Sequence, residues 1–118
     1  MSTMETVQSY FRDLQEKREW TAYLADDIHF TSYTSPIKEV RGKKAYLDST
    51  RRFYSMVVSL HVRDLIISEE KVCALTRYVL HSPSGSNFVS DVAEIMTVRN
   101  GRIGSLSIFF DPAPFPKT

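Results

Sequence analysis

The fold is decided by residues 87–110, which read NFVSDVAEIMTVRNGRIGSLSIFF. Two β-rich segments, Asn87–Arg99 and Ile103–Phe110, lie on either side of the dipeptide Asn100-Gly101. Asn-Gly is the strongest short hairpin signal, because both residues tolerate the positive φ that tight turns between antiparallel strands require. This stretch therefore predicts two long antiparallel strands closed by a tight turn.

Two more strands are expected upstream of this hairpin. Val72–His81 precedes Ser82–Ser86, whose Ser, Pro and Gly residues are typical of a hairpin turn. Leu60–Ile67 is also rich in strand-forming residues and ends at the polar turn Ser68–Lys71. Downstream, the tail Asp111–Pro116 is stiffened by proline and cannot continue a central strand. The C-terminal half is thus predicted to be a run of antiparallel strands.

The N-terminal part has helical spacing instead. Ser2 and Glu5 are placed as in a capping box. Apolar residues then recur every three or four positions, which predicts a helix over residues 3–18: Met4, Val7, Tyr10, Phe11 and Leu14. A second, short helix is predicted to end at Ala25–Asp27, because the same spacing recurs at Trp20, Tyr23 and Leu24.

The period changes to two at Ile28, which predicts a strand. Ile28, Phe30 and Ser32 alternate with His29, Thr31 and Tyr33 until Ser35-Pro36, where proline breaks the pattern. A third helix is expected after Gly42, with one stripe made of Tyr46, Thr50, Phe53 and Val57. Helices gathered before a run of strands imply an α+β fold. We expect one domain, residues 1–118, in which a strongly curved, mostly antiparallel mixed sheet wraps N-terminal helices into a cone.

Composition restricts the classes of function. The chain has 118 residues, of which 42% are apolar, and 15 basic residues nearly balance 14 acidic ones. A net charge of +1 gives no field that would attract nucleic acid or an anionic membrane, and the apolar runs are too short to span a bilayer. The first residues do not resemble a secretory signal. Cys73, the only cysteine, is interpreted as a small buried hydrophobe, which suggests a reducing, cytoplasmic location.

Alternation along the strand after Asn87 selects Glu94 as the candidate reactive group. Glu94 shares a face with Val92 and Met96, and we interpret this apolar face as the lining of a pocket. Burial there would raise the pKa of the carboxyl group, as acid–base chemistry beside a carbonyl requires. The alternative is a structural ion pair with Arg77 or Arg63. Asp91 falls on the opposite face unless a bulge intervenes.

Three segments resemble the nuclear transport factor 2-like superfamily, also called cystatin-like α+β cones. They are Leu24–Phe30, Arg41–Ala45 and Asn100–Ile103. Within the superfamily the chain is most similar to the SnoaL-like polyketide cyclases and the ketosteroid isomerases. The resemblance covers residues from about Met4 to Phe115. It indicates the fold more strongly than the reaction, because this fold supports many activities.

The resemblance also implies roles for particular residues. Val7–Tyr10 is similar to the segment that carries the isomerase's oxyanion-hole tyrosine, which places Tyr10 on that tyrosine. Glu94 falls on the isomerase's second oxyanion donor. Where the isomerase has its general-base aspartate, this chain has Thr31–Tyr33, so steroid isomerisation itself is not expected. SnoaL-like cyclases use a strand acid as the base, which makes Asp91 a reserve candidate.

The function expected from these features is cofactor-independent isomerisation, cyclisation or dehydration of a small apolar carbonyl compound. Residues expected to contact the ligand are Ser32, Phe30, Trp20, Phe53, Met96, Leu106, Ile108 and Phe110. The alternative is a non-catalytic binding or dimerisation module whose cone is filled by such side chains. A cavity of roughly 300 Å³ that contains Glu94 and Tyr10 would favour chemistry.

Two further expectations concern metals and assembly. His29, His61 and His81 have no metal-type spacing, so no metal site is expected. Each histidine is interpreted as a surface or structural residue, with an acid–base role like that in scytalone-dehydratase-like relatives left open. The outward sheet face carries Ala93 and Ile95, which predicts a homodimer formed through the sheet.

Overall fold

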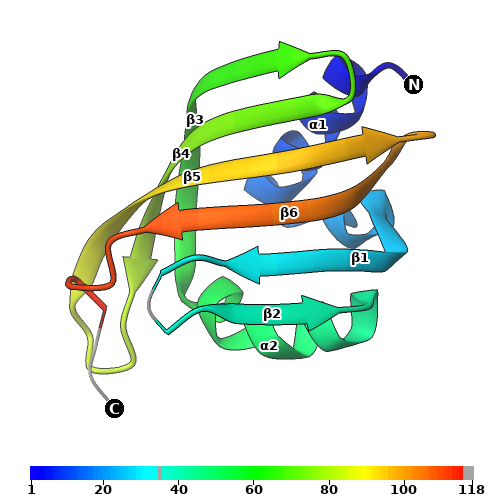
Figure 1. The fold of residues 1–118 in the computed structure, drawn as a ribbon. Coiled ribbons are helices and arrows are strands. Elements are labelled where there is room, and N and C mark those ends of the chain that lie inside the picture. Colours follow the sequence, from blue (N-terminus) through cyan, green and yellow to red (C-terminus); the bar gives the residue numbers. More distant parts are fainter. Residues whose placement is uncertain (35, 116–118) are drawn as a thin grey trace.

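The computed structural model describes residues 1–34 and 36–115 (Figure 1). In chain order the helices and strands are α1 (Thr3–Gln15), η1 (Trp20–Tyr23), β1 (Leu24–Ser32), β2 (Lys38–Arg41), α2 (Lys43–Met56), β3 (Val57–Ser68), β4 (Lys71–His81), β5 (Asn87–Arg99) and β6 (Arg102–Phe110). The predicted break at Ser35-Pro36 and the predicted tail to Pro116 each include a residue outside the described ranges.

The strands form one mixed sheet in the order β2-β1-β6-β5-β4-β3. β1 and β6 run parallel, while the other neighbouring strands are antiparallel. Both helices lie on the same side of the sheet, α1 against β3 and β5 and α2 against β1 and β2, and the long strands bend around them (Figure 1). This arrangement confirms the predicted α+β class with its curved, mostly antiparallel sheet.

The predicted hairpin at Asn100-Gly101 is confirmed. β5 has the predicted bounds, and Asn100 and Gly101 both adopt left-handed backbone angles, with φ of 52° and 72°. In the preceding turn, the Gly85 backbone N–H donates to the Ser82 carbonyl oxygen at 2.9 Å, and His81 pairs with Asn87. The two turns therefore set the pairing register of β4, β5 and β6.

The first part of the chain differs from the prediction in two places. The capping box at Ser2 and Glu5 is present, but α1 ends at Gln15 because the chain turns at Lys17, whose φ is 57°. The predicted second helix is only a 3-10 turn, and β1 begins at Leu24, four residues earlier than expected. Leu24 pairs with β6, and the register of this pairing shifts between Leu24 and His29. Leu24 and Ile28 are therefore both buried within a strand, although they are four residues apart, a spacing typical of a helix.

Sequence analysis also missed β2 and misplaced one boundary. β2 is a short edge strand of largely exposed residues, which gives little hydrophobic alternation to detect. The third helix ends at Met56, and Val57, expected on its stripe, already belongs to β3. Cys73 is half-buried, so the prediction of a fully buried residue is wrong.

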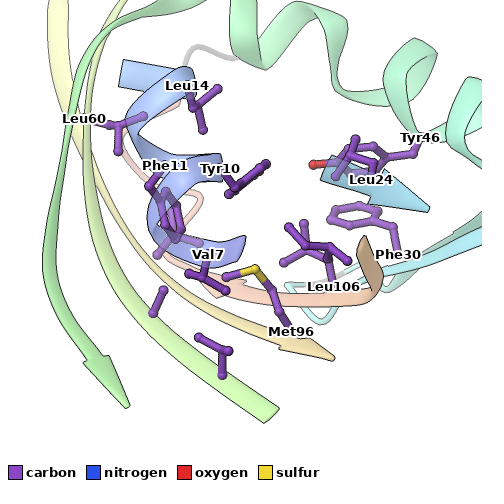
Figure 2. Packing of buried hydrophobic residues seen from close by; sticks show 14 of the residues in the cluster. Val7, Tyr10, Phe11, Leu14, Leu24, Phe30, Tyr46, Leu60, Met96 and Leu106 are labelled. Carbon is purple, nitrogen blue, oxygen red and sulfur yellow. The ribbon is translucent and has the colours of Figure 1, made fainter. Parts of the chain in front are cut away.

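The core between α1 and the sheet follows the predicted helical stripe. Val7, Tyr10, Phe11 and Leu14 are buried, whereas Met4 at the start of the stripe is 44% exposed. Figure 2 shows these helix residues on one side of the core, with Phe30 and Tyr46 on the other side. No helix in residues 1–34 and 36–115 is long and apolar enough to cross a membrane. Because α1 fills one end of the curved sheet, room for a cavity on the inner face remains at the other end, beneath α2.

Candidate functional site

A cavity of about 290 Å³ lies between α2 and the inner face of the sheet. Its wall is formed mainly by apolar and aromatic side chains, and Glu94 also lines it. Of the ligand-contacting residues predicted from the sequence, six line this cavity: Phe30, Ser32, Phe53, Leu106, Ile108 and Phe110. The cone is therefore not completely filled by these side chains.

Glu94 projects from β5 into this cavity and is 2% exposed. Its oxygen Oε2 accepts two hydrogen bonds from β4, from the Thr76 hydroxyl at 2.6 Å and from the Tyr78 hydroxyl at 2.9 Å. In the described part of the chain, Oε1 accepts no hydrogen bond, and it is not among the fully enclosed polar atoms that lack a partner. We conclude that Oε1 is the oxygen open to the cavity.

The electrostatic environment of Glu94 favours the proton-bound form. Burial raises the pKa of the Glu94 carboxyl group, and the hydrogen bonds from Thr76 and Tyr78 partly offset this effect because they stabilise the carboxylate. The predicted alternative, an ion pair with Arg77 or Arg63, is wrong. Both arginines lie on the outer face of the sheet and bind Asp91 there.

A pair of hydrogen-bonded tyrosines from α2 also lines the cavity. The Tyr46 and Tyr54 hydroxyl groups are 3.1 Å apart. Burial holds the pKa of both phenols well above the ordinary value, so both are neutral. When two hydroxyl groups share one hydrogen bond, one of them donates and the other keeps its own hydrogen free. The pair therefore holds one O–H that its own hydrogen bond does not use.

The structure does not bring three of the predicted residues to the cavity wall. Tyr10 is completely buried, but it is not a lining residue; its ring packs 6.2 Å from that of Trp20, which in turn lies 4.7 Å from the Tyr54 ring. Trp20 is likewise outside the lining, and Met96 is buried in the core. α1 covers the far end of the sheet, and the phenols that line the cavity come from α2 (Tyr46 and Tyr54) and from β4 (Tyr78).

Asp91 occupies a different environment from Glu94. It lies on the outer face of β5, as alternation predicted, and its side chain is 56% exposed. Arg77 donates to both of its carboxylate oxygens, at 2.8 and 3.0 Å, and these bonds lower the pKa of Asp91. The reserve candidate for the base is therefore a surface ion pair, separated from the cavity by the thickness of the sheet.

Sequence analysis overlooked Thr76, Tyr78, Tyr46, Tyr54 and Ser90. Ser90 lines the cavity, is 2% exposed, and its hydroxyl has no hydrogen-bond partner among the described residues. Thr76 and Tyr78 could have been predicted as neighbours of Glu94, because the turn after His81 fixes the β4–β5 register. That register places both side chains on the same face of the sheet as Glu94. Tyr46 and Tyr54 of α2 could not have been predicted as cavity residues, since helical spacing alone does not say which strand of the sheet they face.

The histidines lie away from the cavity. His29 contacts Glu39 at 2.6 Å, His81 contacts Asn87 at 2.6 Å, and His61 is exposed. These positions fit the interpretation of surface histidines rather than the acid–base alternative. Across residues 1–34 and 36–115, there is no group of three or more His, Cys, Asp or Glu side chains that could hold a metal ion.

Comparison with known proteins gives matches to one sequence family and to several solved structures. The sequence model of the family described as the SnoaL-like domain matches residues 7–105. A search of curated proteins gave no match. A protein from Bacillus subtilis, provisionally named an isomerase, is 20% identical with a TM-score of 0.79, covering 94% of this chain and 87% of that chain.

Two other structures show the same fold at low identity. A SnoaL-like protein from Jannaschia sp. CCS1, provisionally named a polyketide cyclase, is 13% identical with a TM-score of 0.79, covering 94% of this chain and 86% of that chain. An NTF2-like protein of unknown function from Burkholderia pseudomallei K96243 is 20% identical with a TM-score of 0.80, covering 96% and 94%. At these identities the likeness concerns the fold, and it confirms the predicted nuclear transport factor 2-like architecture.

Proposed function

The chain belongs to the SnoaL-like domain family, and we propose that it catalyses proton transfer next to the carbonyl group of a small, largely apolar molecule without a cofactor. Isomerisation, cyclisation and dehydration all begin with such a transfer. The single observation that carries the proposal is the Glu94 carboxyl group, which is buried, has no ion-pair partner among the described residues, and is open to a cavity through one oxygen.

The arrangement around Glu94 supports a role as proton carrier. Because Oε2 already accepts two hydrogen bonds, Oε1 is the atom available to a ligand in either protonation state. When ionised, Oε1 can accept a proton, and when protonated it can donate one. A raised pKa brings the two forms closer to balance near neutral pH, which is where a general acid–base group works best.

The proposed reaction balances without an external reagent. Glu94 Oε1 takes a proton from the carbon next to the carbonyl group, and the electrons of the C–H bond move to the carbonyl oxygen. A hydroxyl group of the Tyr46–Tyr54 pair donates a hydrogen bond to the resulting enolate oxygen. Return of the proton from Glu94 to another carbon of the ligand completes an isomerisation and restores the carboxylate.

In this scheme Tyr46 and Tyr54 take the role that the resemblance gave to Tyr10. The hydroxyl of Ser90, buried and without a partner, is a further contact for a polar group of the ligand. Phe30, Phe53 and Leu106 supply apolar surface for the ligand's carbon skeleton. A cavity of about 290 Å³ is small for a ligand site and suits one or two rings.

Proton exchange on a simple ketone tests the proposal directly. In D2O, the protein should accelerate the replacement of hydrogen by deuterium at the α-carbons of 2-tetralone, followed by proton NMR. Glu94→Gln should reduce the rate about 100-fold or more, since that is the scale of general-base catalysis. Asp91→Asn is the matched control on the outer face of the same strand and should leave the rate unchanged.

The possible results separate two functions. If 2-tetralone binds but its exchange is not accelerated, the protein is a binding module. The sequence is compatible with that result, because Thr31–Tyr33 contains no acid where the ketosteroid isomerases have their general base. If Glu94→Gln exchanges the ketone as fast as the unaltered protein, Glu94 has no part in the reaction. Only a rate that depends on Glu94 and not on Asp91 supports the proposed mechanism.

We also propose that the chain, as a single domain, forms a homodimer through the outer face of the sheet. Large apolar side chains are exposed there: Leu75 (39%), Val89 (41%), Ile95 (39%) and Phe109 (47%). Burial of such a surface in a symmetric interface is favourable. Ile95→Glu should give a monomer in sedimentation equilibrium at micromolar concentration, and a monomeric unaltered protein would refute the proposal. The half-buried single thiol, Cys73, is consistent with a cytoplasmic location.

A further inference from the structure

Besides the acidic Glu94, two basic side chains line the cavity. Lys38 comes from β2 and Arg52 from α2, and both residues are exposed, which places them at the open end. Within residues 1–34 and 36–115, neither side chain forms an ion pair, because the neighbouring acids are taken by other bases. Glu39 contacts His29 and Arg41, while Asp48 contacts Arg51 and Lys44.

Strand pairing places Lys38 in line with Glu94 across the sheet. Lys38 pairs with Ser32, Ser32 pairs with Ile108, and Ile108 pairs with Glu94. All four residues line the cavity. Three strand spacings separate the ends of this row, so the Cα atoms of Lys38 and Glu94 are roughly 14 Å apart. The flexible stem of Lys38 can cover part of that distance, leaving on the order of 10 Å for a ligand.

Helical spacing directs Arg52 to the same opening. Arg52 lies three residues after Ser49 and four residues before Met56 along α2, and all three residues line the cavity. The opening therefore carries a lysine on the sheet side and an arginine on the helix side. An anionic group at the end of a ligand could contact both cations while its apolar body remains in the cavity.

We infer that the substrate is a keto acid, an apolar carbonyl compound that also carries a carboxylate about two fused rings away from the reacting carbonyl. This inference rests on the proposed function and adds the substrate's second functional group. The carbonyl end lies at Glu94, and the carboxylate lies between Lys38 and Arg52. Arg52 suits this role because a guanidinium group can donate two parallel hydrogen bonds to one carboxylate.

Matched ligands separate the contribution of the carboxylate from that of the ring system. The probes are 6-acetyl-2-naphthoate, its methyl ester and 2-acetylnaphthalene, with dissociation constants measured by isothermal titration calorimetry at low ionic strength. We expect the carboxylate to bind about 10-fold more tightly than the ester, since the contact is charged but open to water. The difference should shrink in 0.5 M salt (about the concentration at which surface charges are well screened).

The variant protein Lys38→Gln/Arg52→Gln should lose the preference for the carboxylate and keep its affinity for the ester and for 2-acetylnaphthalene. Lys44→Gln is the matched control. Lys44 is also on α2 and its side chain is 94% exposed, but it does not line the cavity, so this variant should keep the full preference.

Each remaining outcome counts against a particular statement. Equal affinity of the unaltered protein for the carboxylate and the ester overturns the keto-acid inference, while exchange of 2-tetralone that depends on Glu94 would still support the proposed function. An equal loss of preference in Lys44→Gln also overturns the inference, because it would reflect overall charge. If none of the three ligands binds, the inference fails; if 2-tetralone also fails to exchange, the proposed function fails with it.

Discussion

Replacing Tyr78 by phenylalanine tests the environment of Glu94 without any knowledge of the substrate. The change removes one of the two hydroxyl groups that donate to Glu94 Oε2 and leaves the ring in place, packed 5.1 Å from the ring of Phe53. Because the hydrogen bond from Tyr78 lowers the pKa of Glu94, its loss should raise that pKa further. Carbon-13 NMR of the Glu94 carboxyl carbon, followed against pH, measures this shift directly.

The same variant should also lose stability in a pH-dependent way. A buried hydrogen bond to an ionised group contributes about 2 kcal/mol to the free energy of unfolding, and one to a neutral group about 1 kcal/mol. We therefore expect Tyr78→Phe to lose about 2 kcal/mol above the Glu94 titration and about 1 kcal/mol below it. Urea unfolding at several pH values checks this, and the larger loss corresponds to roughly 8 °C in melting temperature.

A matched control is available at Tyr33, which is 47% exposed and stacks on Phe109. Tyr33→Phe makes the same chemical change on the surface and should alter the free energy of unfolding by less than about 0.5 kcal/mol. The reasoning is refuted if the Glu94 titration midpoint in Tyr78→Phe stays in place or moves down. A loss of stability that is equal at all pH values would also refute it.

Three further predictions concern Glu94, Ser90 and Gly101. Burial raises the pKa of Glu94 in the folded state, so the unaltered protein should lose stability as pH rises from about 4.5 through the folded pKa. Over that pH window, urea titrations should show the free energy of unfolding of Glu94→Gln increasing relative to that of the unaltered protein. A difference that does not change with pH would contradict this prediction. Ser90→Ala should raise the free energy of unfolding by up to about 1 kcal/mol, because the buried hydroxyl that it removes has no partner among the described residues. Calorimetry that shows a loss above about 1 kcal/mol would count against this prediction. Gly101→Ala should cost about 1 kcal/mol, measured by thermal melting, because alanine fits poorly at φ of 72°, and an unchanged melting temperature would be the contrary result.

The C-terminal sheet was predictable because its contacts are local. Each hairpin is closed by a turn that the sequence marks clearly, and a turn of known length fixes the pairing register until a bulge shifts it. The β4–β5 pairing is uninterrupted, whereas the β5–β6 pairing shifts between Thr97 and Val98. The face that carries Glu94 was read correctly for the same reason. The same register could also have predicted the neighbours of Glu94 on β4. If His81 pairs with Asn87, then Ala74 lies opposite Glu94 and Thr76 lies two residues further along β4, on the same face.

The N-terminal end of β1 and the edge strand β2 were not predictable from the sequence. β1 pairs in parallel with β6, from the other end of the chain, and the irregular pairing between Leu24 and His29 gives these residues a spacing that resembles a helix. β2 is an edge strand and lacks a buried face. Neither feature leaves a pattern that sequence reasoning can separate from a loop or a short helix.

The position of Tyr10 shows a related limit of sequence periodicity. The sequence showed that Tyr10 lies on the buried stripe of α1, and the structure agrees. Which part of the sheet this stripe covers depends on how far α1 lies from α2 across the curved sheet, and periodicity contains no such information. The phenols that line the cavity belong to α2 and β4, whereas Tyr10 of the first helix is buried in the core.

The strand β5 holds two carboxylates whose pKa values move in opposite directions. Asp91 and Glu94 are three residues apart, an odd number, so they lie on opposite faces of the sheet. On the outer face Arg77 stabilises the charge of Asp91, whereas on the inner face burial opposes the charge of Glu94, which forms no ion pair within residues 1–34 and 36–115.

An unpaired acid in an apolar wall costs stability, and a leucine at position 94 would avoid that cost while filling part of the cavity. Glu94 joins β5 to β4 through Oε2 alone, whereas both carboxylate oxygens of Asp91 are bound by Arg77 of β4. A group that costs the fold stability and leaves one oxygen open to a cavity is best explained by what that oxygen does to a ligand. The measured gain in stability of Glu94→Gln at neutral pH would be the size of that cost.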